Sequence, residues 1–300
     1  MSKFIPLLDG LSFTECPRWR DGRLYFSDRY TRRILAVSID GFVETYARTD
    51  GLPAGIGFLP DGRLLIASMR DRKVLRREPD ETIVEHADLS ALATGYLNDM
   101  LVDDEGYAWV GNFGFDLFGG EPACSTVLIR VAPDGTPAIA ARDLAFPNGT
   151  VLTPDGSPEG RTLIIAETMA NRLTAFTISN GVLSGRRTWA AFGDPPATTD
   201  VSKILKDAAV VPDGICLDAE GAVWVADVLN RRVIRVAEGG AILNELMTGG
   251  LCAFACMLGG DDGRTLFVCA APTFDETEAA AHHRSSILMT RVEVPHAGLP

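Results

Sequence analysis

The sequence predicts an all-β fold, a six-bladed β-propeller with four antiparallel strands in each blade. Three observations lead to this prediction. A turn made of an acidic residue and glycine precedes a short β-branched or aromatic run, and this pattern occurs six times. The intervals between the copies are at or above the roughly 40–50 residues typical of one blade. Convincing helical periodicity is almost absent along the chain.

The repeated unit is typical of a β-hairpin, because turns of this kind connect antiparallel strands. Its six copies are RDGRLYFSD (20–28), PDGRLLIAS (60–68), DEGYAWVGN (104–112), PEGRTLIIAE (158–167), AEGAVWVAD (219–227) and DDGRTLFVCA (261–270). The intervals on either side of the fourth copy are the longest, which predicts insertions there. A third run follows each copy, as in RRILAVSI (32–39), and a weaker fourth run follows several of them.

The two ends of the chain are expected to complete the ring of blades. We expect KFIPLLDG (3–10) to form a strand beside SSILMTRVEV (285–294) in the last blade. Closure of this kind leaves no exposed sheet edges. Residues 1–300 then form one propeller domain. A two-domain interpretation needs a linker, and the nearest candidate, 192–200, falls inside a repeat and is better explained as a loop insertion.

Composition and charge restrict the classes of function. The chain has 300 residues, 46% of them hydrophobic and 23% charged, and its formal net charge is −12. This acidic balance argues against a nucleic-acid partner, since phosphate binding needs a basic face. No segment approaches the roughly 20 apolar residues of a membrane span, and the N-terminus has no run typical of a signal peptide. We therefore expect a cytoplasmic protein without nucleic-acid or membrane partners.

The six cysteines are scattered along the chain, and none stands in a pattern typical of a zinc module. Cys252 and Cys256 leave open a disulfide or a pair that binds a soft metal. In a reducing compartment all six are more simply explained as small core residues.

One position of the repeat is expected to converge on the propeller axis, because propeller strands start at the central channel and run outwards. Counting back eight residues from each turn glycine gives this position. The count starts at Gly156 in the fourth unit and is seven residues in the first unit. The residues found are Glu15, Ala54, Asn98, Asn148, Asp213 and a residue near 253–255.

Four of these six residues offer oxygen: Glu15, Asn98, Asn148 and Asp213. Brought together, the two carboxylates would repel each other, and one would be driven towards protonation. A divalent cation removes this conflict, and carboxylate and amide oxygens suit Ca²⁺, Mg²⁺ or Mn²⁺. Each residue alone also has an ordinary explanation. Pro-Asn-Gly and Pro-Asp-Gly are common turn sequences, and Glu15 has arginines nearby with which to pair. The shared register of all four favours a metal.

The motifs around these positions resemble those of one known family. TECPRW (14–19), LND (97–99), PNG (147–149) and PDG (212–214) follow in the same order as motifs of the SMP-30/gluconolactonase/luciferin-regenerating-enzyme family. The resemblance covers nearly the whole chain. It implies a six-bladed propeller with one divalent metal that commonly hydrolyses sugar lactones or other cyclic esters.

Carried onto this sequence, the resemblance makes Glu15, Asn148 and Asp213 metal ligands. It makes Asn98 a residue that contacts the metal or the substrate, and Asp213 the general base as well. One position departs from the family. Sugar-lactonase members often have an arginine where this chain has Tyr96, and we expect Tyr96 to contact the substrate. A tyrosine offers a ring face and one hydroxyl, which favours a less polar lactone or ester.

The resulting hypothesis is a metal-dependent hydrolase that opens a lactone with activated water at the axis. The metal is expected to be Ca²⁺, with Zn²⁺, Mn²⁺, Mg²⁺ and Fe²⁺ as alternatives. The partner is a small lactone or ester, and the protein is a monomer or a small homo-oligomer. Two alternatives remain open, a phosphotriester hydrolase on the same scaffold and a propeller that binds without catalysis.

Two loops are expected to shape the pocket. Residues 111–125 contain Phe113, Phe115 and Phe118, which either line an apolar pocket or cap the core. Residues 192–210 are expected to include a short helix, and 277–284 a second one. Asp99 is expected either to hold the amide of Asn98 or a metal-bound water, or to hydrogen-bond its own backbone.

Overall fold

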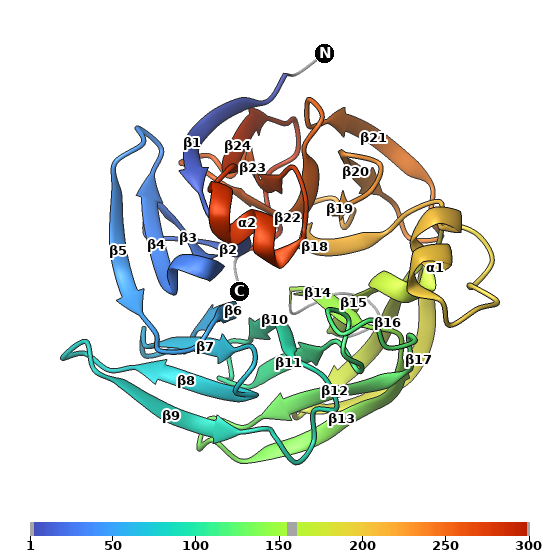
Figure 1. The fold of residues 1–300 in the computed structure, drawn as a ribbon, viewed down its shortest axis with the longest axis horizontal. Coiled ribbons are helices and arrows are strands. Elements are labelled where there is room, and N and C mark those ends of the chain that lie inside the picture. Colours follow the sequence, from blue (N-terminus) through green and yellow to red (C-terminus); the bar gives the residue numbers. More distant parts are fainter. Residues whose placement is uncertain (1–2, 155–160, 299–300) are drawn as a thin grey trace.

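The computed structural model describes residues 3–154 and 161–298 and contains six four-stranded antiparallel sheets arranged around one axis (Figure 1). This confirms the predicted six-bladed β-propeller. The turn glycines Gly156 and Gly160 of the fourth unit lie outside the described residues. Among the helices of the described ranges, none is long and apolar enough to cross a membrane.

The first three blades each run outwards from the axis in chain order. Blade one contains β2 (Thr14–Arg20), β3 (Arg23–Asp28), β4 (Arg33–Ser38) and β5 (Val43–Arg48). Blade two contains β6 (Pro53–Phe58), β7 (Leu64–Ser68), β8 (Lys73–Arg77) and β9 (Ile83–Asp88). Blade three contains β10 (Leu97–Val102), β11 (Ala108–Asn112), β12 (Thr126–Val131) and β13 (Pro137–Leu144).

The last three blades have the same plan, except that the sixth borrows a strand from the start of the chain. Blade four contains β14 (Pro147–Leu152), β15 (Thr162–Glu167), β16 (Arg172–Ser179) and β17 (Val182–Ala191). Blade five contains β18 (Pro212–Leu217), β19 (Val223–Asp227), β20 (Arg232–Val236) and β21 (Ile242–Met247). Blade six contains β22 (Cys252–Gly259), β23 (Thr265–Ala271), β24 (Ser285–Arg291) and β1 (Ile5–Leu11).

The ring closes between the two ends of the chain, as predicted. Strand β1 pairs antiparallel with β24, with Ile5 opposite Met289 and Leu11 opposite Ser285. Figure 1 shows β1 as the outer strand of blade six, next to β24. The hydroxyls of Thr14 and Ser285 lie 2.8 Å apart, so the closing strand also touches the start of β2.

Each innermost strand carries a β-bulge near its inner end. In β14, for example, Pro147 is opposite Glu167 and Thr150 is opposite Ile165, so two residues face one. Corresponding register shifts occur in β2, β6, β10, β18 and β22. A bulge changes the direction of the side chains at its position. The six innermost strands therefore change the direction of side chains at equivalent positions around the axis.

The glycines that follow Asn148 and Asp213 are required by close packing of neighbouring strands. A Cβ atom on Gly149 would lie 2.5 Å from the backbone nitrogen of Ile215 in the next blade. A Cβ atom on Gly214 would lie 2.5 Å from the Cβ of Ala255. PNG and PDG therefore form the inner ends of strands β14 and β18 rather than turns, which rules out the turn interpretation of these sequences.

Buried carboxylates attach three of the blades to the segment that leads into them. Asp28, Glu167 and Asp227 end the second strand of blades one, four and five, and each is fully buried. Each pairs with the arginine five residues later, at 2.9 Å in blades one and four and 2.7 Å in blade five. Each also accepts a backbone N–H from the lead-in to its own innermost strand.

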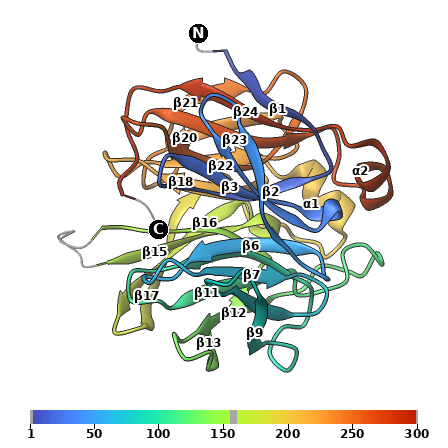
Figure 2. The same cartoon turned by 90° about the vertical axis from the view of Figure 1, so that its left-hand side faces the viewer.

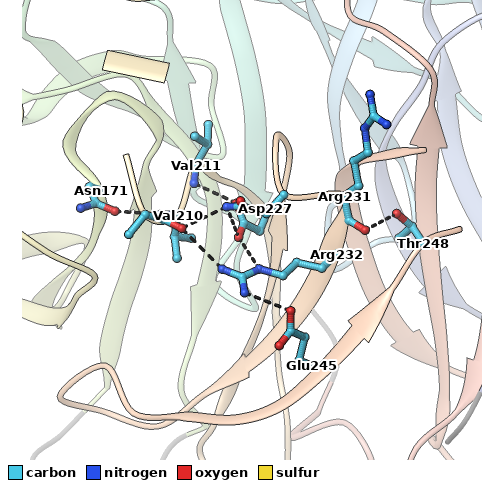
Figure 3. Close-up of polar contacts among 10 residues, drawn as sticks. Asn171, Val210, Val211, Asp227, Arg231, Arg232, Glu245 and Thr248 are labelled. Carbon is cyan, nitrogen blue, oxygen red and sulfur yellow. Dashed lines mark hydrogen bonds and ion pairs between the residues drawn. The ribbon is translucent and has the colours of Figure 1, made fainter. Parts of the chain in front are cut away.

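Figure 3 shows this arrangement around Asp227 in blade five. The Asp227 carboxylate accepts the backbone N–H of Val211 at 3.0 Å and the Nε–H of Arg232 at 2.7 Å. Arg232 also donates to Glu245 at 3.0 Å on the outer strand. One residue earlier, the N–H of Val210 donates to the side-chain oxygen of Asn171 in blade four at 3.0 Å. The segment just before Asp213 is thus held from two blades.

The helices predicted within 192–210 and 277–284 are confirmed. Helix α1 (Val201–Asp207) and helix α2 (Glu276–His282) are each capped by an aspartate, Asp200 and Asp275. Two single-turn 3₁₀ helices, η1 (Arg29–Thr31) and η2 (Thr168–Ala170), follow β3 and β15. Figure 2 shows α1 and α2 on the same face of the propeller.

The cysteines form no disulfide: all six are free thiols. Cys252 and Cys256 lie on the same strand, and the Sγ of Cys256 lies 3.8 Å from the Sγ of Cys216 on β18 instead. Five of the six are buried, which agrees with their interpretation as small core residues.

The Asp227 network gives a testable expectation for stability. We expect Asp227→Ala to lower the free energy of unfolding by about 3 kcal/mol, because it leaves the buried Val211 N–H without its acceptor and the Arg232 charge with only its more exposed partner, Glu245. Asp227→Asn keeps an acceptor for Val211 and should cost less. Urea unfolding measures both. Asp262→Ala, which removes an exposed ion pair with Arg291, is the control; equal losses in the Asp262 and Asp227 alanine variants would contradict the expectation.

Candidate active site

The four oxygen-bearing side chains singled out from the sequence lie at one position of the fold. Glu15, Asn98, Asn148 and Asp213 are each the second residue of an innermost strand, β2, β10, β14 and β18. Their exposed fractions are 6%, 5%, 4% and 8%. All four line one cavity of about 70 Å³ at the inner ends of these strands. In blades two and six the second residue is alanine, Ala54 and Ala253.

The first hairpin of blade one explains why seven residues separate Glu15 from the turn glycine there, whereas eight separate the equivalent residues in other blades. Its first hairpin is closed by the pair Arg20–Arg23, which leaves a two-residue turn. In blade five the last pair is Leu217–Val223, with a longer turn. The difference lies at the outer end of the strand, so Glu15 keeps the same place relative to the axis as Asp213.

Burial and mutual repulsion disfavour the ionised forms of the two carboxylates. Burial is the largest cause that raises the pKa of Asp213 well above its usual value, and the charges of Glu15 and Asp99 raise it further. Burial also raises the pKa of Glu15 to about 7, although Arg29 opposes this shift. A cation between the two would remove the repulsion.

Arg29 is a site residue that the sequence reasoning missed. It opens η1 directly after Asp28, and its side chain is buried against the ring of Phe13, with Cζ 4.8 Å from the ring centre. Its Nη2 lies 3.7 Å from Oε1 of Glu15, longer than a charged hydrogen bond. Its Nε has no hydrogen-bond partner within the described ranges. The sequence feature that could have identified Arg29 is its position directly after β3, the second strand of blade one.

Arg18 and Arg20, the arginines close to Glu15 in the sequence, have other partners. Arg18 donates to Asp99 at 2.9 Å and to the carbonyl of Met100 at 2.6 Å. Arg20 pairs with Asp21 at 3.2 Å. Asp99 also accepts the backbone N–H of Met100 at 2.7 Å. The Asp99 carboxylate is therefore held in a buried ion pair beside the site and, like Arg18, is not part of the cavity lining.

The two amide side chains are held differently. Nδ2 of Asn148 donates to the Thr168 hydroxyl at 3.1 Å, and that hydroxyl donates to the carbonyl of Pro212 at 2.8 Å. This fixes the amide of Asn148 with its Oδ1 available as a ligand. Nδ2 of Asn98 is buried and has no partner in the part of the chain that the structure describes. A buried amide donor without a partner lowers the stability of the fold. We therefore infer that Asn98 binds a ligand.

Aromatic side chains from the predicted loop 111–125 form part of the wall. Phe113 and Phe118 line the cavity, whereas Phe115 packs behind Phe146, with ring centres 6.1 Å apart. Tyr96 is not among the lining residues. Its ring packs 6.1 Å from Phe113 and 6.3 Å from Phe118, and Arg70 lies over it. The 192–210 loop contributes Leu205 of α1 to the cavity.

The donor set fits a hard divalent cation. It consists of two carboxylates and two amides, all buried and all supplying oxygen, which suits Ca²⁺ or Mg²⁺. Within residues 3–154 and 161–298, no group of three or more His, Cys, Asp or Glu side chains is placed to hold a metal. The oxygen-only set of Glu15, Asn98, Asn148 and Asp213 favours a hard cation over metals that prefer nitrogen or sulfur.

A second cavity of about 210 Å³ opens along the outer ends of the same innermost strands. It is lined by Arg18, Cys216 and His296, among others, and by none of the four oxygen-bearing residues. We therefore place the candidate site in the smaller cavity, where the unpartnered polar groups and the raised carboxylate pKa values coincide.

The fold and the cavity define the class: a six-bladed propeller that gathers carboxylate and amide oxygens from four blades at its axis. Residues 13–272 match the family described as SMP-30/Gluconolactonase/LRE-like region, and the chain belongs to this family. The resemblance seen in the sequence motifs is thereby confirmed.

Individual relatives show what this chain is similar to. A 6-deoxy-6-sulfogluconolactonase of Pseudomonas putida is 24% identical, over 95% of this chain and 93% of the relative. The pentonolactonase XacC of Haloferax volcanii is 24% identical, over 86% of this chain and 81% of the relative. A calcium-binding regucalcin from Agrobacterium tumefaciens has the same fold, with a TM-score of 0.77, 21% identity, and coverage of 98% of this chain and 95% of its own. Lactone hydrolysis is therefore an activity of the family.

The raised carboxylate pKa values predict how the metal-free protein responds to pH. A carboxyl group whose pKa is higher in the folded state destabilises the fold once it ionises. The contribution of Glu15 to stability is thus complete below about pH 4.5 and lost as the pH rises to about 7.

The test compares the native chain with Glu15→Gln in urea, with a chelator present, at about pH 4.5 and pH 8. The free energy of unfolding of the native chain relative to that of Glu15→Gln should fall by about 3 kcal/mol over this range, with Glu15 and Asp213 titrating as a pair. Parallel pH profiles of the two proteins would show that Glu15 does not titrate abnormally.

Proposed function

We propose that this protein is a divalent-metal-dependent lactonase that opens a cyclic ester with water in the cavity around Glu15 and Asp213. The observation that carries the proposal is the meeting of four buried oxygen-bearing side chains from four blades in one cavity. Two relatives named as lactonases support the choice of reaction.

Glu15, Asn98, Asn148 and Asp213 would hold one divalent ion, and Ca²⁺ is our first choice. The oxygen-only donor set and the calcium-binding regucalcin of the same fold support this choice. Mg²⁺, Mn²⁺, Zn²⁺ and Fe²⁺ are the alternatives. When bound, such an ion supplies Lewis-acid polarisation of the acyl carbonyl and stabilises the negative charge that develops on its oxygen.

Asp213 is the proposed general base. One of its carboxylate oxygens takes a proton from the water whose oxygen bonds to the acyl carbon. The bond between the acyl carbon and the ring oxygen then breaks, and the ring oxygen takes up a proton. The product is a hydroxycarboxylic acid, so one lactone and one water are consumed for each product.

Asn98 and Arg29 supply the remaining polar contacts. The unpartnered Nδ2 of Asn98 would donate to a substrate oxygen and so orient the ring. The guanidinium of Arg29 opposes the rise in the pKa of both Glu15 and Asp213, and so favours the ionised forms that metal binding and base catalysis need. Tyr96 supports Phe113 and Phe118 from behind, and we propose that it acts on the substrate through them.

Removal of the proposed base should abolish turnover without unfolding the chain. We expect Asp213→Asn to lower kcat by about 10²–10⁴-fold, since general-base catalysis contributes an effect of that size. Initial rates of lactone hydrolysis measure this, with circular dichroism as the check on folding. Asp61→Asn, in an exposed turn of blade two, is the matched control. Activity of Asp213→Asn within tenfold of the native chain would assign the base to another group.

Metal removal should abolish activity reversibly. We expect chelation to stop hydrolysis and added Ca²⁺ to restore it and to raise the Tm, because an ion that binds only the folded state stabilises it. Glu15→Gln should weaken the metal Kd and the activity together. Full activity of chelated Glu15→Gln would contradict the scheme. The assay panel includes an aryl ester and a phosphotriester. Turnover of the phosphotriester alone would favour a phosphotriester hydrolase. No turnover of any compound would favour a propeller that binds without catalysis.

A further inference from the structure

We propose that the substrate is a lactone with an extended hydrocarbon substituent rather than a polyhydroxylated sugar lactone. This inference rests on the proposed lactonase function and names the substrate class of the same cavity. Three observations support it. Few polar groups in the cavity lack a partner, the walls around the four oxygen-bearing side chains are apolar, and apolar side chains are exposed at the mouth of the cavity.

The cavity has few polar groups left for a substrate. Apart from the four proposed ligands, only Arg29 and Thr168 among the described lining residues have polar side chains. The Thr168 hydroxyl is already engaged with Asn148 and with the Pro212 carbonyl. The remaining donors are Nδ2 of Asn98 and the guanidinium of Arg29, whose Nε has no partner within the described ranges. One amide and one guanidinium suffice for the single ester group of an aliphatic lactone, whereas a sugar lactone would bury several hydroxyls with too few partners among mostly apolar lining residues.

The walls next to these donors are aromatic. Phe13 packs on Phe254 with ring centres 4.7 Å apart, and Phe113 packs on Phe146 at 4.5 Å. All four rings are buried and line the cavity. Such walls favour a hydrocarbon surface and offer no hydrogen bonds from their ring carbons.

The mouth continues this apolar surface into solvent. Leu229, in the connection between β19 and β20, is 38% exposed, and Phe274, just before α2, is 37% exposed, yet both line the cavity. Leu205 of α1 and Phe118 complete the mouth. Figure 2 shows that α1 and α2 lie on this one face. Exposed apolar side chains that gather at a cavity mark a binding groove for an apolar group, here the substituent of the lactone.

The experiment measures kcat/KM for γ-lactones that carry a methyl, propyl or pentyl substituent. Each buried methylene should raise kcat/KM about threefold, so the pentyl compound should exceed the methyl compound by about 100-fold. Glucono-δ-lactone is compared with an alkyl-substituted δ-lactone of the same ring size. We expect the sugar lactone to be the poorer substrate by at least about tenfold.

Two variants locate the effect. The double variant Leu229→Ser with Phe274→Ser makes the mouth polar, and we expect the gain per methylene to fall below about twofold. The double variant Phe42→Ser with Leu243→Ser makes the same chemical change at exposed positions in the outer part of blades one and five and should keep the threefold gain. Because all four side chains are exposed, we expect both variants to fold.

The outcomes separate this inference from the proposed function. Preference for glucono-δ-lactone, or an unchanged gain per methylene in the Leu229 and Phe274 variant, would overturn the substrate class and leave the lactonase proposal standing. If no lactone is hydrolysed with any metal, the lactonase proposal fails. The substrate class is then judged by calorimetric binding of alkyl-substituted pyrrolidones to the chelated protein: affinity that rises with chain length supports an apolar ligand, and affinity that does not rise rejects it.

Discussion

The repulsion between two buried carboxylates, Glu15 and Asp213, is the constraint around which the rest of the structure is organised. Neither has enough hydrogen bonds to offset the loss of water, and the charge of Glu15 raises the pKa of Asp213 further. The fold nevertheless places them together. Bulges turn them inwards, glycines after Asn148 and Asp213 let the strands approach, and Arg29 offsets part of the charge. Such an arrangement persists only if the surrounding fold holds the two carboxylates in place. A bound cation would remove the repulsion between them.

The surrounding fold holds the two carboxylates in place through contacts that lie outside the cavity. Buried Asp28 and Asp227 hold the chain that leads into β2 and β18 by accepting its backbone N–H groups. Trp19 stacks on Phe267 at 5.2 Å, which packs blade one on blade six at the other end of β2 from Glu15. The site is thus preorganised by fully buried polar and aromatic contacts on rigid strands, so the oxygens need not reorganise when a ligand enters.

The sequence predicts the fold and the four oxygen-bearing positions because both depend on a repeat. One register error would have moved Asn148 or Asp213 off the axis, yet all four lie in one cavity. Features that depend on a single blade were missed. Arg29 follows a strand end without any repeated signal, and Tyr96 packs against Phe118 behind the cavity wall. The alternative that PNG and PDG are turns could be set aside only with the structure, in which both begin innermost strands. Their environment comes from neighbouring blades, which local patterns do not describe.

The pairing of β1 with β24 has a consequence for how the protein matures. Thr14, which precedes Glu15, touches Ser285 at the start of the closing strand, so the Glu15 backbone gains its final neighbours only when that strand arrives. During synthesis on a ribosome, blades two to five can assemble early, but Thr14 gains its contact beside Glu15 only after Ser285 has emerged. The proposed lactonase activity would then depend on β24, and a chain cleaved before this strand would lack that activity.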